Sequence, residues 1–118
     1  MKILLVVDDE VGITDALTDL LSEEGYLVLV ARNGKDGLKR IAEKRPDLVL
    51  LDYMMPVMDG REMLLALRAD PAYQDLPVLL MSAMPRSSIP PDCKPSAFLR
   101  KPFELDQLLM EVGRLLAG

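Results

Sequence analysis

The sequence LVLLDYMMPVMDG, residues 48–60, places a carboxylate directly after an unbroken apolar run. A run of four apolar residues with no polar residue between them is typical of a strand that is covered on both faces. Asp52 stands at the end of that run, where burial of a charge is costly unless the charge is paired or bound to a cation. The stretch therefore predicts a buried strand of a parallel sheet with a functional group at its carboxyl end.

Similar apolar runs recur along the chain, and segments with helical spacing of apolar residues separate them. The expected strands are Ile3–Val7, Leu27–Val30, Leu48–Leu51, Val78–Met81 and, more weakly, Ala97–Leu99. The expected helices are one that carries Ile13 to Leu21 and ends at Gly25, one capped by Asn33 that stops before Pro46, one that begins at Asp59 with Glu62 as a capping-box partner, and one from about Glu104 to Leu116. The alternation predicts an α/β fold with a doubly wound parallel sheet, built as one domain over residues 1–118.

The composition narrows the possible chemistry. The 118 residues contain no histidine, which excludes a Ser-His-Asp triad, a Cys-His pair and a histidine metal site. The net charge of -5 argues against nonspecific binding to nucleic acid or to anionic membranes. Cys93 is the single cysteine, so no internal disulfide forms, and no apolar window of about 18 residues is present. We expect a soluble cytoplasmic protein.

Two further carboxylates, Asp8 and Asp9, follow the first expected strand directly. Ligands of an open parallel sheet bind outside the carboxyl ends of its strands. If the first and third strands are neighbours, as in the flavodoxin-like order 2-1-3-4-5, these two carboxylates and Asp52 converge. Three carboxylates without histidine or thiol form a hard-oxygen site suited to Mg²⁺. The alternative is that Asp8, Asp9 and Glu10 only cap the first helix, where its dipole favours negative charge.

Four motifs, in this order, resemble the receiver domain of two-component response regulators. They are Asp8-Asp9 after the first strand, LDYMMPVMDG over 51–60, Ser82-Ala83 after the fourth strand and Lys101-Pro102-Phe103 after the fifth. The resemblance covers nearly the whole chain. It implies that Asp52 is the phosphoacceptor, which attacks a phosphohistidine of a partner kinase in a Mg²⁺-dependent reaction. It also implies that Asp9 and Asp52 hold the cation, helped by Asp8 and the backbone carbonyl of Met54.

The same resemblance gives roles to three more residues. Lys101, next to a cis bond to Pro102, would place positive charge at the phosphoryl oxygens. Ser82 would hydrogen-bond the phosphoryl group, and Phe98, three residues before the lysine, would be the aromatic residue of the switch. Each has a simpler alternative: a surface lysine, a turn serine and a core phenylalanine. Because Phe98 has no hydroxyl, we expect it to favour a buried position.

The expected function is therefore that of a signalling phosphoacceptor and not of an enzyme, either as a stand-alone, chemotaxis-type regulator or as a receiver module. Its partners would be a sensor histidine kinase or phosphotransfer protein and then a downstream protein or a second copy, with no direct nucleic acid or membrane contact. The alternative is a receiver-fold binding module that signals without phosphorylation. The acidic pair, the acceptor and the lysine are all present, which favours phosphorylation. A phosphatase of the aspartate-nucleophile class would need a second aspartate where Met54 stands.

The segment SAMPRSSIPPDCKPSAFLRKP, residues 82–102, departs from the family pattern. Prolines stand at positions 85, 90, 91 and 95, where the family places its fourth helix. A proline inside a helix costs about 3 kcal/mol, and the residue before a proline resists helical angles, so only 86–88 remains open. We expect a loop or one short turn in place of this helix, with Met84 and Ile89 covering part of the sheet.

Overall fold

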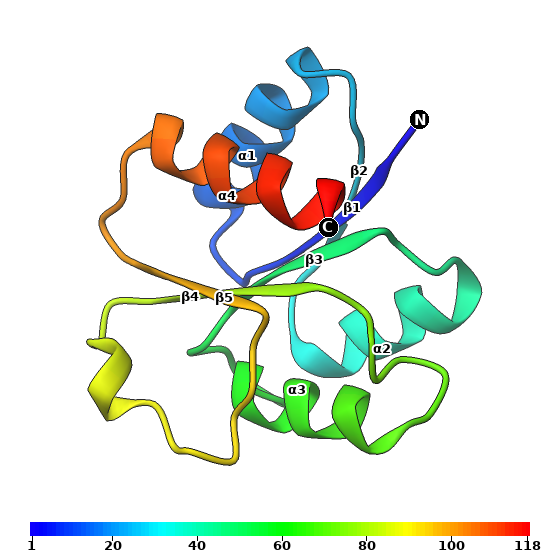
Figure 1. Cartoon of the computed structure of the whole chain (residues 1–118), viewed down its shortest axis with the longest axis vertical. Coiled ribbons are helices and arrows are strands. Elements are labelled where there is room, and N and C mark those ends of the chain that lie inside the picture. The colour runs from blue at the N-terminus through cyan, green and yellow to red at the C-terminus, as the bar shows by residue number, and fades with distance from the viewer.

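The computed structural model describes residues 1–118 as a five-stranded parallel sheet with helices on both sides (Figure 1). The strands are β1 (Ile3–Val7), β2 (Leu27–Ala31), β3 (Leu48–Asp52), β4 (Val78–Ser82) and β5 (Ala97–Arg100). The helices are α1 (Val11–Glu23), α2 (Gly34–Glu43), α3 (Gly60–Ala69) and α4 (Leu105–Ala117), and one 3₁₀ turn, η1, spans Arg86–Ser88. The strand order is β2-β1-β3-β4-β5, so the predicted flavodoxin-like sheet is confirmed.

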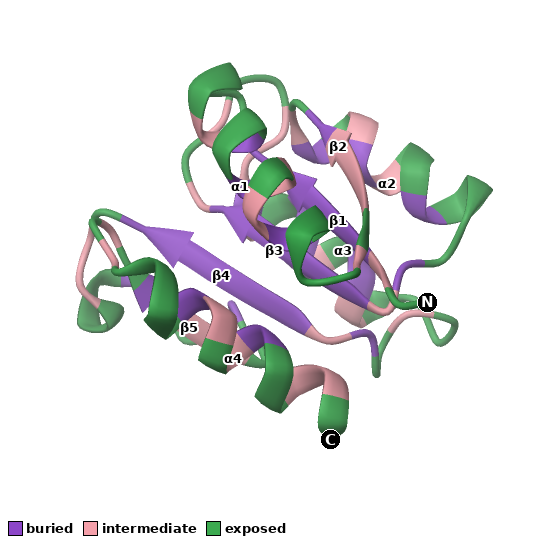
Figure 2. Ribbon diagram, turned by 90° about the horizontal axis from the view of Figure 1, so that it is seen from above, coloured by how far each residue is buried: buried purple, intermediate pink, exposed green.

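Two hydrophobic clusters cover the two faces of the sheet. α1 and α4 lie over one face, and α2 and α3 lie over the other (Figure 1). Leu17 of α1 and Leu108 of α4 belong to one cluster, whereas Ile41 of α2 and Leu64 of α3 belong to the other. Figure 2 shows β3 and β4 buried along their whole length. The unbroken apolar runs in the sequence reflect this double cover.

The first residues of α3 lie directly beside the end of β3. Asp59 Oδ1 accepts a hydrogen bond from the Glu62 amide at 2.8 Å, and Glu62 Oε1 accepts one from the Asp59 amide at 3.2 Å, which is the predicted capping box. Gly60 follows the cap. A Cβ at this position would lie 2.5 Å from the main-chain oxygen of Asp52. Only glycine therefore allows α3 to begin this close to the carboxyl end of the central strand.

No α-helix connects β4 to β5, and we call residues 83–96 of this connection the crossover segment. Its one regular element is η1 over Arg86–Ser88, the window that the prolines leave open, so the prediction of a short turn in place of the fourth helix is confirmed. Ile89 and Cys93 are buried in the cluster under α2 and α3, and Met84 packs against the same cluster. Ile89 and Met84 were expected to cover the sheet, whereas Cys93 was not.

Two arginines of α3 hold the crossover segment from outside. Arg61 forms a two-bonded ion pair with Asp92. The Arg68 guanidinium donates to the Ser96 hydroxyl and to the main-chain carbonyls of Tyr73, Gln74, Leu76 and Lys94. Main-chain polar groups without partners cost free energy when they are covered. Arg68 therefore satisfies part-buried carbonyls of the turn between α3 and β4 and ties the crossover segment to that turn through Lys94 and Ser96.

We predict that Arg68→Gln lowers the free energy of unfolding by about 1–3 kcal/mol, because several acceptors lose a charged donor together. Urea unfolding measures this change, and hydrogen exchange over 94–96 should become faster. The matched control is Arg40→Gln, which removes an exposed arginine from α2 and should change stability by less than about 0.5 kcal/mol. Equal effects of the two substitutions would contradict the anchoring role of Arg68.

Candidate functional site

Three neighbouring strands deliver buried polar side chains to one edge of the sheet. Asp8 follows β1, Asp52 ends β3 and Ser82 ends β4. β3 pairs with β1 on one side and with β4 on the other, so these carboxyl ends are adjacent. Thr14 is the only other buried polar or charged residue outside this group. Burial of charge is thus concentrated at a single place in the molecule.

Asp8, Asp9 and Asp52 form a cluster of carboxylates at this edge. Each offers one oxygen, and the three oxygens lie within 4.8 Å of one another. Asp8 and Asp52 are buried and Asp9 is exposed, so the cluster opens to solvent on the Asp9 side. An all-oxygen donor set with an open side fits Mg²⁺, which takes few protein ligands and keeps several waters. The structure thus brings together the three carboxylates that the sequence predicts to converge.

The acidic triplet contributes little to capping α1. Glu10 is the N-cap residue and makes no side-chain capping hydrogen bond, and the first turn contains no acidic residue. Asp8 Oδ1 accepts a hydrogen bond from the Glu10 amide at 3.0 Å, while Asp8 Oδ2 faces the cluster and Lys101. Helix capping alone therefore does not account for three consecutive carboxylates.

Lys101 neutralises part of the negative charge. Its Nζ lies 3.1 Å from Asp52 Oδ1 and 3.3 Å from Asp8 Oδ2, and its side chain is only 19% exposed. The Lys101 amide donates to the Ser82 carbonyl, and the Lys101–Pro102 peptide bond is cis. The lysine is thus a half-buried partner of two carboxylates and not a fully solvated surface residue.

Asp52 remains electrostatically unfavourable despite this partner. Burial, followed by the charge of Asp8, raises the pKa of Asp52 from 3.8 to about 6, although the hydrogen bond and charge of Lys101 lower it. Burial also lowers the pKa of Lys101, but the hydrogen bonds and charges of Asp52 and Asp8 outweigh it, and that pKa is raised. One lysine therefore compensates the carboxylates only in part, which leaves the cluster favourable for a further cation.

The other predicted residues, Ser82, Met54 and Phe98, have different surroundings. Ser82 Oγ accepts a hydrogen bond from the Met84 amide at 3.0 Å. Met54 is 67% exposed, and its thioether is a soft ligand that does not suit Mg²⁺, so a contribution to a metal site would come from its main-chain carbonyl. Phe98 is half-buried against the cluster under α2 and α3, and Arg86 Cζ lies 5.8 Å from the centroid of its ring. The sequence analysis missed Arg86, because no local pattern marks a contact between a loop cation and a strand.

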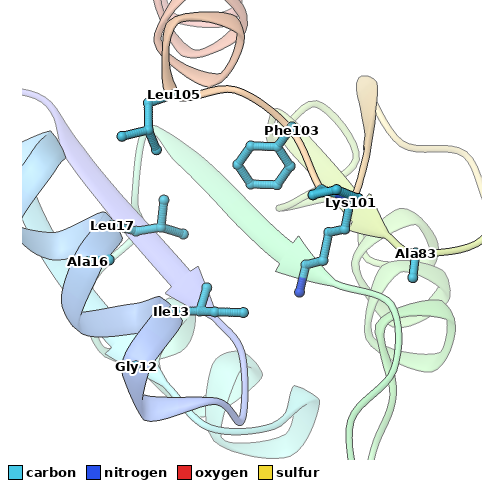
Figure 3. Close-up of a pocket in the computed structure, with 9 residues that line it drawn as sticks. Gly12, Ile13, Ala16, Leu17, Ala83, Lys101, Phe103 and Leu105 are labelled. Carbon is cyan, nitrogen blue, oxygen red and sulfur yellow. The ribbon is translucent and has the colours of Figure 1, made fainter.

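An apolar groove of about 510 Å³ runs from the cluster along α1 (Figure 3). Its walls are Gly12, Ile13, Ala16 and Leu17 of α1 and Ala83, Lys101, Pro102, Phe103 and Leu105 from the other side. Lys101 closes one end and extends toward the carboxyl end of β3, and Leu105 is largely exposed. The groove joins residues that are far apart in the sequence, which is why the sequence analysis did not predict it.

Comparisons with known proteins agree with this geometry. A family model described as the response regulator receiver domain matches residues 4–113. The response regulator MprA of Mycolicibacterium vanbaalenii is 40% identical over 96% of this chain and 49% of its own length, so the chain spans about half of this curated relative.

Solved structures show the same similarity. The receiver domain of a signal transduction histidine kinase from Syntrophus aciditrophicus has a TM-score of 0.92 and 31% identity, covering 100% of this chain and 92% of that chain. The chemotaxis response regulator CheY4 of Vibrio cholerae has a TM-score of 0.90 and 29% identity, covering 98% of each chain.

We predict that Asp52→Asn stabilises the metal-free protein above pH 6. The pKa of Asp52 is about 6 in the folded protein, and we take the reference value of 3.8 for the unfolded chain. Between these two pH values the folded protein therefore binds more protons than the unfolded chain does. Its stability therefore falls as the pH rises through that window. In EDTA at neutral pH, the substitution should raise the free energy of unfolding by on the order of 1 kcal/mol, and it should have little effect near the lower pKa.

Urea titrations at both pH values provide the measurement. Asp19→Asn, at an exposed position on α1, is the control and should shift stability only slightly at either pH. A loss of stability in Asp52→Asn at neutral pH would show that the ion pair with Lys101 outweighs the burial of Asp52.

Proposed function

Because this chain belongs to the response regulator receiver domain family, we propose that it accepts a phosphoryl group on Asp52 from a sensor histidine kinase or a phosphotransfer protein. The observation that carries the proposal is the pairing of half-buried Lys101 with two buried carboxylates, Asp8 and Asp52, beside the carboxylate of Asp9. In this proposal residues 1–118 act as a single receiver domain in the cytoplasm. The domain is a phosphoacceptor in a signalling pathway and not an enzyme.

Asp52 is the nucleophile. Its carboxylate oxygen attacks the phosphorus of the phosphohistidine, an O–P bond forms, and the P–N bond breaks as the imidazole nitrogen takes the electron pair. The Asp52 residue is 6% exposed, so the donor has to approach at the open edge of the sheet. The product is an aspartyl phosphate in a site where no histidine or thiol competes for the phosphoryl group.

Lys101 and Ser82 orient and stabilise the transferred group. The Lys101 ammonium, already 3.1 Å from Asp52 Oδ1, donates to the phosphoryl oxygens and offsets their charge. The Ser82 hydroxyl stands at the end of the adjacent strand and donates to the same group. Mg²⁺ held by Asp8, Asp9, Asp52 and the backbone carbonyl of Met54 would supply the positive charge that one lysine cannot provide.

The apolar groove offers the phosphodonor a docking surface next to the acceptor. It ends at Lys101, and its rim includes exposed Leu105. α1, which forms one wall of the groove, exposes Asp15 and Asp19, and residues 3–31 contain no lysine or arginine. A donor protein with an apolar patch flanked by basic residues would match this surface in shape and charge.

Phosphorylation would then change binding to a downstream protein or to a second copy of the chain. We expect no direct contact with nucleic acid or membrane, because the net charge is -5. None of the helices has the length and apolar character needed to cross a bilayer.

Incubation with Mg²⁺ and acetyl phosphate should add one phosphoryl group to the wild-type protein, and intact-mass spectrometry measures the addition. Asp52→Ala should show no addition because the nucleophile is absent. Asp19→Ala, which removes an exposed carboxylate of α1, should be modified like the wild type. If the wild type gains no phosphoryl group and shows no Mg²⁺-dependent spectral change, a binding module that signals without phosphorylation is the remaining function.

Lys101→Met should separate cation binding from phosphoryl transfer. Without the ammonium, Asp8 and Asp52 lose their only cationic partner, so Mg²⁺ should bind several-fold more tightly. The rate of modification by acetyl phosphate should nevertheless fall by about 100-fold or more, because a charged donor to the phosphoryl oxygens is lost. Calorimetric titration and timed mass spectra measure the two quantities, with exposed Lys39→Met as the control. An unchanged rate would restrict Lys101 to a structural role.

A further inference from the structure

A few residues at the start of the crossover segment contact both Ser82 at the end of β4 and Phe98 of β5. The Met84 amide donates to Ser82 Oγ at 3.0 Å, which ties the first residues of the segment to the hydroxyl at the end of β4. Two residues later, Arg86 begins η1 and places its guanidinium over the ring of Phe98, with 5.8 Å from Cζ to the ring centroid. Phe98 lies opposite Leu80 in the β4–β5 pairing. One short stretch of chain therefore touches both strands whose ends carry Ser82 and Lys101.

The contact between Arg86 and Phe98 is specific in its chemistry. Phe98 has no hydroxyl, so the face and edge of its ring are its means of making a directional contact. Arg86 is exposed, and the ion pairs of the structure involve other residues, so its guanidinium is directed to the ring and not to a carboxylate. A guanidinium over an aromatic ring at a partly exposed site changes an equilibrium by about two- to fivefold.

The far end of the crossover segment is fixed. Ile89 and Cys93 are buried in the hydrophobic cluster, and Asp92 pairs with Arg61 at the start of α3. If Ser82 and the Met84 amide move, the anchored residues from Ile89 onward therefore do not move with them. It has to be taken up between Met84 and Ile89, and that stretch contains Arg86.

We propose that Arg86 is a positioning residue that restrains the phosphoryl switch through its contact with Phe98. The inference rests on the proposed function and names a regulator of the same site. For Ser82 to engage a phosphoryl group on Asp52, its hydroxyl turns toward Asp52, and the Met84 amide and η1 follow. That displacement separates Arg86 from the Phe98 ring. The contact consequently stabilises the arrangement that does not engage the phosphoryl group, and by linkage its removal strengthens phosphoryl binding.

Beryllofluoride with Mg²⁺, a mimic of the phosphoryl group, provides the test, and ¹⁹F NMR gives both the presence of the adduct and its affinity. Arg86→Gln should bind beryllofluoride about two- to fivefold more tightly than the wild type. Arg86→Lys keeps a cation over the ring and should lie closer to the wild type. Arg40→Gln removes an exposed arginine from α2 and should not change the affinity. Circular dichroism melts establish that each variant is folded.

A double-mutant cycle with Phe98→Leu tests whether the effect passes through the ring. Leucine keeps an apolar side chain at this position but removes the aromatic face. In the Phe98→Leu background, Arg86→Gln should give no further gain in affinity, because the contact is already lost.

Three results would overturn the inference. If the wild type forms the adduct and Arg86→Gln binds it no more tightly than Arg40→Gln does, Arg86 is not a restraint, while the proposed function stands. If the gain in Arg86→Gln persists in the Phe98→Leu background, the effect does not pass through the ring. If no variant and no wild-type sample forms an adduct, the proposed function itself fails, and the inference fails with it.

Discussion

The burial of a carboxylate at the end of the central strand is the constraint on which the rest of the structure depends. β3 is buried along its whole length and ends in Asp52, so a charge is placed where water cannot fully solvate it. The raised pKa of Asp52 is the direct sign of this cost. The ammonium of Lys101 offsets part of this cost, while the absence of a side chain at Gly60 lets α3 start against the main-chain carbonyl of Asp52. The proposed chemistry of the site follows from the same constraint, since a carboxylate that is only partly compensated attracts a cation.

The sheet and the positions of the main site residues could be predicted because they depend on short-range patterns. Unbroken apolar runs define the strands, and a charged residue directly after such a run, as at Asp8 and Asp52, has to lie at the carboxyl edge of a parallel sheet. The capping residues Asn33 and Asp59 likewise act within three positions of themselves. Distances within the cluster and the direction of the pKa shift of Asp52 could not be derived, because they depend on side-chain positions from three separate elements.

The crossover segment shows where prediction from the sequence ends. The prolines exclude a helix between β4 and β5, and this could be predicted because a proline acts on the backbone of its immediate neighbours. What holds the segment in place is not local: Arg61 reaches Asp92, Arg68 reaches Lys94, and Arg86 meets Phe98. Such pairs have no sequence spacing of their own, since each depends on how α3 and β5 happen to be placed against the loop. The apolar groove beside α1 is a similar case, because α1 and the turn after β5 meet only in the folded chain.

The crossover segment is held by side chains and not by the main-chain hydrogen bonds of a helix, and this also affects the order in which the molecule folds. A helix carries most of its hydrogen bonds within itself, so part of its stability is present before it docks. The crossover segment has only η1 as a regular element, and it depends on the arginine donors of α3 and on a core that β3, β4 and α3 build. We therefore expect its native contacts to form late in folding, and the segment to open at a lower free energy than the global unfolding of the sheet. We therefore expect the connection between β4 and β5, which contacts β5 close to Lys101, to open before the sheet does.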